Sequence, residues 1–351
     1  MPLNGTLVKH AIFWTTLILL IPLAACTKSS YNVHQTLRAA RYQAPNGSPE
    51  LLAVYQPWFG SKEHIDVGYS SVDKAVLQRQ ITEAANLGID GFLVNWYGPR
   101  LEYMDRSYAL LQDLASRSNF KTAILYDEAV DNPGHETDAV IVDLQYAYDR
   151  YISPQAGPSR SAYLHYDGRP VIFIFPKTTK TDWNRVRQVA DSWPERPLLI
   201  YKDSSAEYAK AFDGFYAWVQ PGKQGWSANG NNWGEDYLSA FYKRMLSTYP
   251  DKIAVGAAWP GFDDSRASWS LNRRISSRCG KTLEDSLRLY RRYYSDGRTL
   301  PFLLIVTWND YEEGTAIERR SASCGQSGTQ YPLQTSSEVR AGPAYSSNPA
   351  R

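Results

Sequence analysis

Short apolar runs alternate with longer amphipathic stretches from Leu51 to about residue 306. A short apolar run bounded by turn residues is typical of a strand buried on both faces, as in a parallel sheet. The runs predict eight strands, at residues 51–59, 91–97, 121–127, 171–175, 197–201, 214–219, 252–258 and 302–306.

The stretches between these runs predict helices. In the first, at about residues 72–87, apolar residues recur at helical spacing from Leu77 to Ala85, and Gly88 ends the pattern. Asp167 and Gly168 form a tight-turn signal between residues 163–166 and strand 171–175, which predicts a hairpin. Further helices are expected around residues 110–114 and at 136–151, 181–193, 205–211, 233–249 and 281–294.

This alternation predicts a (β/α)8 TIM barrel, in which a closed parallel sheet is covered by helices. The main alternative is an open, doubly wound sheet, which usually has fewer strands. No amphipathic stretch follows the last strand, because residues 319–351 are rich in Ser, Gly and Pro. We therefore expect one domain over residues 51–318 and an irregular tail over residues 319–351.

The first 25 residues have the pattern of an export signal. Lys9 and His10 precede an apolar segment, residues 11–23, that is too short to span a bilayer comfortably. The following Leu-Ala-Ala-Cys26 resembles the bacterial lipobox, and this resemblance implies cleavage before Cys26 and its diacylation. An ordinary signal peptide with a chance cysteine is the alternative.

An acylated Cys26 predicts a lipid anchor in the bacterial cell envelope without a transmembrane helix. Thr27 does not match the signal for retention in the inner membrane, so we expect the outer membrane. Residues 26–50 are polar and include the Pro45–Pro49 segment, which predicts a tether between anchor and fold.

Composition narrows the class of partner. The chain has 38 Lys and Arg against 36 Asp and Glu, and this balance gives no reason to expect nucleic acid. Its 25 Tyr and 11 Trp suit stacking against sugar rings, although a large core also uses aromatic side chains.

Two further cysteines, Cys279 and Cys324, form an even pair, which in an exported protein predicts a disulfide. Unpaired thiols are the alternative. Neither cysteine has metal-site spacing, and no Gly-rich phosphate loop is visible, so we expect no metal and no cofactor. We expect a monomer.

Acidic residues follow the last strand directly. Asp310 and Glu313 come after residues 302–306 without an Arg or Lys nearby in sequence, and barrels place their chemistry at this end of a strand. Gly314 allows a sharp turn that would turn both acids toward one cleft. Burial and mutual repulsion would raise the pKa of one acid and make it a proton donor, as glycoside cleavage requires. Pairing with a distant Arg is the structural alternative.

Aromatic and polar side chains also follow the other strands, and a barrel brings these ends to one face. Flat rings meet the C–H faces of sugars, while amides and carboxylates bind hydroxyls. Each residue alone has a plainer interpretation, because a Trp at a strand end often packs in the core and a loop His is often solvated. The candidate sugar contacts are Tyr55, Trp58, His64, Trp96, Tyr97, Asp127, Trp308 and Asn309. For Asn309, holding a carboxylate is the alternative.

Residues 308–318 resemble the signature of glycoside hydrolase family 99, the endo-α-mannosidases and endo-α-mannanases. They are also similar to family 71, the α-1,3-glucanases, whose pattern runs Trp-Asn-Asp-Tyr-x-Glu. The likeness covers roughly residues 51–318 in barrel order. Other matching segments are residues 55–60, 68–73, 88–92, 95–98, 167–171 and 260–264.

The resemblance implies roles for two acids. Glu313 matches the general acid that protonates the leaving oxygen, and Asp310 matches its partner carboxylate. In family 99 the partner is a Glu that deprotonates the sugar's own 2-hydroxyl, with retention. Family 71 has Asp, as here, and a pair of this kind would activate water with inversion. Glu312 has no counterpart acid in either pattern, and we expect it to support the site or to be solvated.

The sequence thus predicts a lipid-anchored (β/α)8 glycoside hydrolase that cleaves α-linked glycans of the mannan or glucan type. A glycan-binding lipoprotein that has lost turnover is the first alternative, and the intact acid pair counts against it. A metal-dependent barrel hydrolase is the second, and the lack of His pairs at strand ends counts against it.

Overall fold

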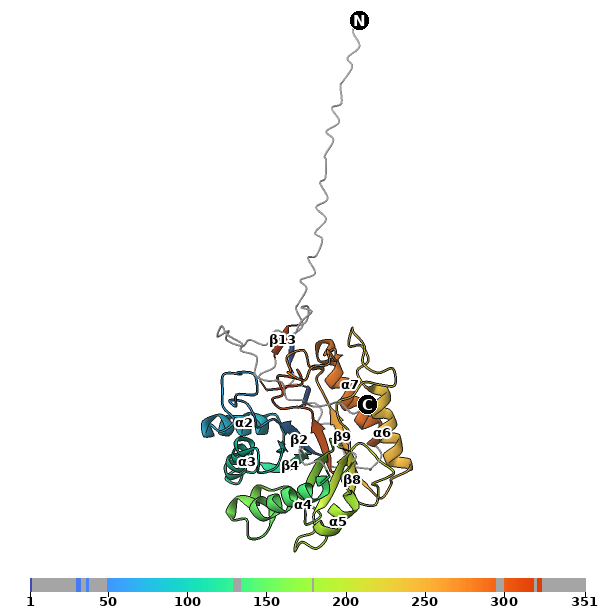
Figure 1. Cartoon of the computed structure of the whole chain (residues 1–351). Helices are drawn as coiled ribbons and strands as arrows, with labels where there is room; N and C mark the ends of the chain where they lie inside the picture. The colour runs from blue at the N-terminus through green and yellow to red at the C-terminus, as the bar shows by residue number, and fades with distance from the viewer. Residues whose placement is uncertain are drawn as a thin grey trace.

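The computed structural model describes residues 1, 30–32, 36–37, 49–128, 134–178, 180–294, 300–318 and 321–323. Eight parallel strands pair in the order β4-β3-β2-β12-β9-β8-β7-β6, and β4 also pairs with β6, which closes the ring (Figure 1). The predicted (β/α)8 barrel is therefore confirmed, and the open sheet is wrong. The strands are β2 (Glu50–Tyr55), β3 (Gly91–Trp96), β4 (Lys121–Asp127), β6 (Arg169–Phe175), β7 (Leu198–Lys202), β8 (Gly214–Tyr216), β9 (Ile253–Ala258) and β12 (Phe302–Ile305).

Helices lie between the strands and cover the outside of the barrel. Asp73 begins the first of them, since its carboxylate accepts the N–H groups of Ala75 and Val76. The helix expected at residues 205–211 is absent, because this short connection forms only turns and Asp203 has a φ of 58°. The long helices are α2 (Lys74–Asn86), α3 (Glu102–Ala115), α4 (Glu136–Ala147), α5 (Trp183–Ala190), α6 (Glu235–Ser247) and α7 (Lys281–Tyr294), with short helices η1 (Tyr148–Ile152), η2 (Pro158–Ala162) and η3 (Arg278–Gly280).

Two hairpins add to the barrel. The predicted one is confirmed: β5 (His165–Tyr166) pairs antiparallel with the start of β6. A second hairpin, of β10 (Phe262–Asp263) and β11 (Arg274–Ile275), follows β9 and lies beside the residues after β12.

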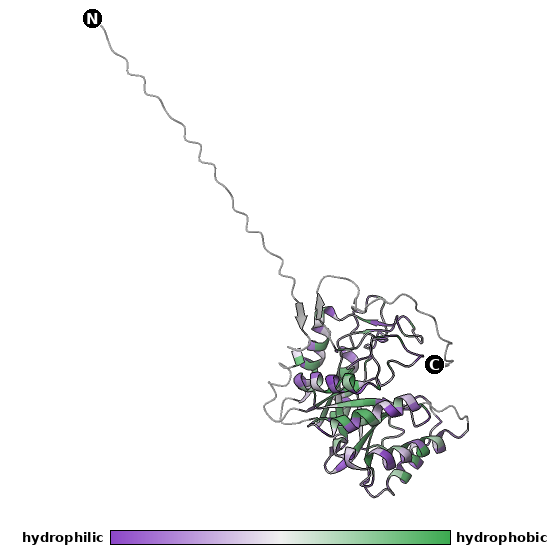
Figure 2. Ribbon diagram, turned by 90° about the vertical axis from the view of Figure 1, so that its left-hand side faces the viewer, coloured by the Kyte–Doolittle hydropathy of each residue, from purple (hydrophilic) through white to green (hydrophobic). Residues whose placement is uncertain are grey.

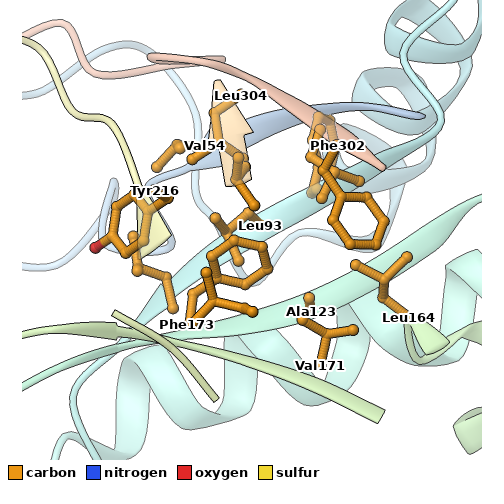
Figure 3. Close-up of a cluster of buried hydrophobic side chains, with 14 of the residues drawn as sticks. Val54, Leu93, Ala123, Leu164, Val171, Phe173, Tyr216, Phe302 and Leu304 are labelled. Carbon is orange, nitrogen blue, oxygen red and sulfur yellow. The ribbon is translucent and has the colours of Figure 1, made fainter. Parts of the chain in front are cut away.

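The barrel interior is apolar, and its carboxyl end is polar. Figure 3 shows inward-facing side chains such as Val54, Leu93 and Phe173 packed together. Because side chains alternate along a strand, the inward positions that follow lie at the carboxyl end of the barrel. They are Gln56, Asn95, Asp127, Phe175 and Lys202. The strands inside the barrel are hydrophobic, and the outer faces of the helices carry hydrophilic residues (Figure 2).

Short segments of the predicted tether and tail pair with each other. β1 (Ser30–Asn32) and β13 (Ser321–Ser323) form an antiparallel pair in which Ser30 lies opposite Ser323. Leu37 is fully buried in the core. Hydrogen bonding and burial therefore fix short segments of these polar regions.

The signal segment 1–25, apart from residue 1, lies outside the described residues, as do Cys26 and Cys324. Cys279 is exposed. Within the described ranges, no helix is long and apolar enough to cross a membrane.

Candidate active site

The chain folds back on itself directly after β12. The Thr307 N–H donates to the Thr315 carbonyl at 3.1 Å, and the two hydroxyls lie 2.9 Å apart. Gly314 has a φ of 62°, and a Cβ there would meet the Asp263 backbone oxygen at 3.1 Å. The predicted sharp turn is confirmed, and it carries residues 310–313.

Asp310 is buried and accepts three hydrogen bonds. Its Oδ1 accepts the backbone N–H groups of Glu312 at 3.1 Å and Glu313 at 2.8 Å. Its Oδ2 accepts the side-chain N–H of Gln56 at 3.0 Å. Three donors directed at one carboxylate favour its charged form and fix its orientation.

Glu313 is only partly buried and has a different environment. Its Oε1 accepts the indole N–H of Trp269, from the β10–β11 hairpin, at 3.2 Å. Burial raises the pKa of Glu313, and the Trp269 hydrogen bond and the positive charges of Arg273 and Lys177 oppose this rise. The net direction is upward, as a proton donor near neutral pH requires.

The two acids act on each other. Burial, followed by the negative charge of Glu313, raises the pKa of Asp310 well above its usual range. Two carboxyl groups that repel each other at a buried site titrate as a pair and keep one proton between them. Asp310 has three donors and Glu313 has one, so the hydrogen bonds favour the proton on Glu313.

Glu312 lies buried and connects the turn to the loop after β2. Its Oε2 is 2.8 Å from His64 Nδ1, and its Oε1 accepts the Ile65 N–H at 3.2 Å. The His64 ring stacks on Trp58 with centroids 4.4 Å apart and planes inclined by 2°. Glu312 is therefore not solvated: it holds His64, and through it Trp58, beside the acids.

A row of polar groups continues from the acids along β2, β3 and β4. Gln56 Oε1 and Asn95 Oδ1 are buried and have no hydrogen-bond partner among the described residues. Asn95 Nδ2 donates to the Tyr97 hydroxyl at 3.2 Å, and Asp127 Oδ1 lies 3.2 Å from Lys177 Nζ. Buried acceptors without partners are costly, and ligand hydroxyls can satisfy them.

Four of the predicted sugar contacts lie together on this face. Trp58 is 6.1 Å from Trp269 and 6.3 Å from Tyr97, measured between ring centroids. Burial raises the pKa of Tyr97, and the charges of Asp127 and Asp310 add to the rise. Trp58, His64, Tyr97 and Asp127 thus surround the acid pair.

Three predicted contacts are corrected, because Tyr55, Trp96 and Trp308 are at most 1% exposed and face away from the open end. The Tyr55 hydroxyl donates to Gln80 of α2 at 2.8 Å, and Trp96 Nε1 donates to Asp105 of α3 at 3.0 Å. The Trp308 ring packs 5.4 Å from that of Phe92 in the core. Strand alternation is the reason for Tyr55 and Trp96, since an outward residue packs against helices.

The prediction of Asn309 as a sugar contact is also corrected. Its Oδ1 accepts the Gln56 N–H at 2.7 Å, and its Nδ2 donates to the Gln56 carbonyl at 2.9 Å and to the Tyr69 hydroxyl at 3.3 Å. These bonds occupy the amide inside the protein. Asn309 therefore positions Gln56, whose side chain binds Asp310, instead of reaching a sugar.

Sequence reasoning missed Gln56, Asn95, Trp269, Lys177 and Lys202. Gln56 and Asn95 could have been found from the sequence, because side chains alternate along a strand and these two lie two residues after the inward Val54 and Leu93. Trp269 lies in a hairpin without periodicity and gave no signal. Within the described ranges, no group of three or more His, Cys, Asp or Glu residues could hold a metal ion.

The fold is similar to that of solved glycoside hydrolases. The GH99 endo-alpha-mannosidase from Bacteroides thetaiotaomicron aligns with a TM-score of 0.59 and 17% identity, over 78% of this chain and 88% of that one. Its complex with BIS-TRIS-propane aligns with a TM-score of 0.57 over the same shares, also at 17% identity. A glycoside hydrolase-like protein aligns with a TM-score of 0.57 and 15% identity, over 82% and 92% of the two chains. No protein-family model and no curated protein matches the sequence. Identities this low show a shared barrel fold.

Proposed function

We propose that this protein is a glycoside hydrolase that cleaves α-linked glycans of the mannan or glucan type. The observation that carries the proposal is the acid pair Asp310 and Glu313, whose hydrogen-bond donors are unequally divided. The barrel shared with an endo-alpha-mannosidase and the resemblance of residues 308–318 to family 99 and family 71 support it.

In this proposal Glu313 is the general acid. Its proton passes to the glycosidic oxygen as the bond to the anomeric carbon breaks, and Glu313 is left as a carboxylate. Asp310, held as an anion by three donors, accepts a proton from the attacking hydroxyl. That hydroxyl belongs either to water or to the sugar's own 2-position. The first route inverts the anomeric configuration and the second retains it, so the sugar released first is the opposite anomer in the two cases.

The surrounding groups are suited to hold a sugar ring against the acids. Gln56 and Asn95 offer buried acceptors, and Tyr97 and Asp127 offer further polar atoms on the same face. Trp58 and Trp269 supply flat apolar surfaces. A glycan that uses these groups would have its scissile bond at Glu313.

The test is hydrolysis of α-mannans, α-1,3-glucan and other α-glucans, with released sugars followed by NMR to identify the first anomer. We expect Glu313→Gln to lower kcat by about 10²- to 10⁴-fold. The exposed Glu284 of α7 provides the matched control, Glu284→Gln, which keeps wild-type rates. No release from any glycan, with binding retained by both wild type and Glu313→Gln, would favour the glycan-binding lipoprotein instead.

A further inference from the structure

Lys202 is an ammonium at the carboxyl end of the barrel. It is the last residue of β7, and its Nζ lies 3.7 Å from the centre of the Phe175 ring. The neighbouring acids are engaged elsewhere, since Asp127 pairs with Lys177 and Asp203 pairs with Arg244. Lys202 forms no ion pair with any carboxylate that the structure describes.

A second ammonium stands next to the first. Lys177 Nζ lies 5.0 Å from the centre of the same Phe175 ring, just beyond the end of β6. Burial, and then the charge of Lys177, lower the pKa of Lys202 to about 8. The negative charges of Asp127, Asp203 and Glu313 oppose this lowering only in part. A buried ammonium without a direct ion pair is unfavourable.

The pair lies on the same face as the acids. Phe175 and Lys202 occupy inward positions of neighbouring strands, in the polar layer that also holds Asp127. Glu313 is among the charges that act on Lys202, and Lys177 is among those that act on Glu313. A group bound by these lysines would thus belong to the same ligand as a bond cleaved at Glu313.

We propose that Lys177 and Lys202 form an anion subsite beside the acid pair, and that the substrate carries an acidic substituent on a sugar next to the scissile bond. A sugar hydroxyl can accept a hydrogen bond from an ammonium, but a carboxylate, sulfate or phosphate forms stronger, charge-assisted hydrogen bonds and would better offset the desolvation of Lys202. The inference rests on the proposed function for its substrate class.

A plainer explanation is that Lys202 only balances the negative charge of the acid pair. In that case its removal would shift the pH profile of kcat equally for neutral and acidic substrates. An anion subsite instead changes the affinity for acidic ligands alone. Binding to a variant that cannot turn over separates these explanations.

The experiment is calorimetric titration of the full-length Glu313→Gln protein with matched oligosaccharides. Each neutral α-mannose or α-glucose trisaccharide is compared with derivatives in which one C6 position is a carboxylate, a sulfate ester or a phosphate ester. We expect at least one acidic derivative to bind about ten- to a hundredfold tighter than its neutral parent. The carboxylate and ester arms distinguish a uronic acid from a sulfated or phosphorylated sugar.

Lys202→Met in the same background should remove this preference, and Lys202→Arg should keep part of it. Lys177→Gln, at a side chain that is 52% exposed, tests the site without disturbing the core. Lys243→Met, on the exposed face of α6, controls for overall charge.

Equal or weaker binding of every acidic derivative, or no binding of any oligosaccharide, would overturn the inference. So would a preference that survives in Lys202→Met. Hydrolysis by the wild type, measured in parallel, distinguishes the two proposals. A preference for acidic ligands without turnover supports the subsite and refutes the hydrolase. Turnover without that preference supports the hydrolase and refutes the subsite.

Discussion

Trp269 Nε1 donates a hydrogen bond to Glu313 Oε1 across 3.2 Å. The contact joins the hairpin after β9 to the proposed proton donor, which lies 44 residues further along the chain. An N–H directed at a carboxylate stabilises its charged form, so Trp269 lowers the pKa of Glu313 against the opposite effect of burial.

Trp269→Phe should therefore raise the pKa of Glu313 further. The alkaline limb of kcat/KM, which reports loss of the proton from Glu313, should move to higher pH. Measured pH–rate profiles check this result. Trp193→Phe, at a Trp that stacks on Tyr148, is the matched control. An unchanged limb in Trp269→Phe would contradict the assigned contact.

Asn309→Ala should lower the free energy of unfolding by about 2–4 kcal/mol, because it leaves the buried N–H and C=O of Gln56 without partners. Activity should also fall, since Gln56 would no longer hold Asp310. Urea unfolding checks the stability, with Asn231→Ala at an exposed loop position as control. Equal losses in the two variants would argue against a positioning role.

The acid pair should make stability depend on pH. Burial raises both pKa values above their ordinary 3.8 and 4.5, so the folded protein holds these protons more tightly than the unfolded chain. Their contribution is most favourable below pH 4 and declines as pH rises through the raised values. Glu313→Gln removes part of this decline and should be more stable than wild type at pH 7. Denaturant unfolding from pH 4 to 8 measures this pH dependence. A Glu313→Gln variant whose stability changes with pH as that of the wild type does would refute the raised pKa of Glu313.

The lipid anchor stays a prediction. Cells that express the protein with a labelled fatty acid should incorporate the label at Cys26, and the protein should sediment with outer membranes. Cys26→Ser should abolish both the label and the sedimentation. A soluble, unlabelled wild-type protein would instead indicate an ordinary signal peptide.

The disulfide also stays a prediction, with support from the strand pairing. η3 contains Cys279 and contacts β1, whose partner β13 ends one residue before Cys324. We expect both thiols to resist alkylation until a reductant is added. Cys324→Ser should expose Cys279 to alkylation and cost about 2–4 kcal/mol of stability. Ready alkylation of native wild type would show two thiols.

The barrel could be predicted from sequence because its strands are apolar on both faces and each ends in a polar or turn residue. The sharp turn at Gly314 could be predicted from that glycine and from the acidic residues before it. Side-chain direction was harder: the aromatic rings of Tyr55 and Trp96 suggested sugar stacking, whereas alternation assigns the open end to Gln56 and Asn95.

Other parts of the site depend on contacts between distant segments. Trp269 reaches Glu313 only because β10 and β11 fold back over the turn, and no local pattern encodes that arrangement. Glu312 is a second case. It is held by Ile65, in a loop 247 residues earlier in the chain, and no local pattern encodes that contact.

The small sheet of β1 and β13 bears on how the protein would stand on a membrane. Three residues separate Cys26 from Ser30, the start of β1, so an extended link spans at most about 14 Å. β13 begins three residues after Glu318, close to the end of the barrel that carries the acids. With Cys26 acylated, this short link would hold the β1–β13 sheet close to the lipid surface. The distance from the bilayer at which the proposed site could meet a polymeric substrate would then be set by the dimensions of the barrel and not by a long tether.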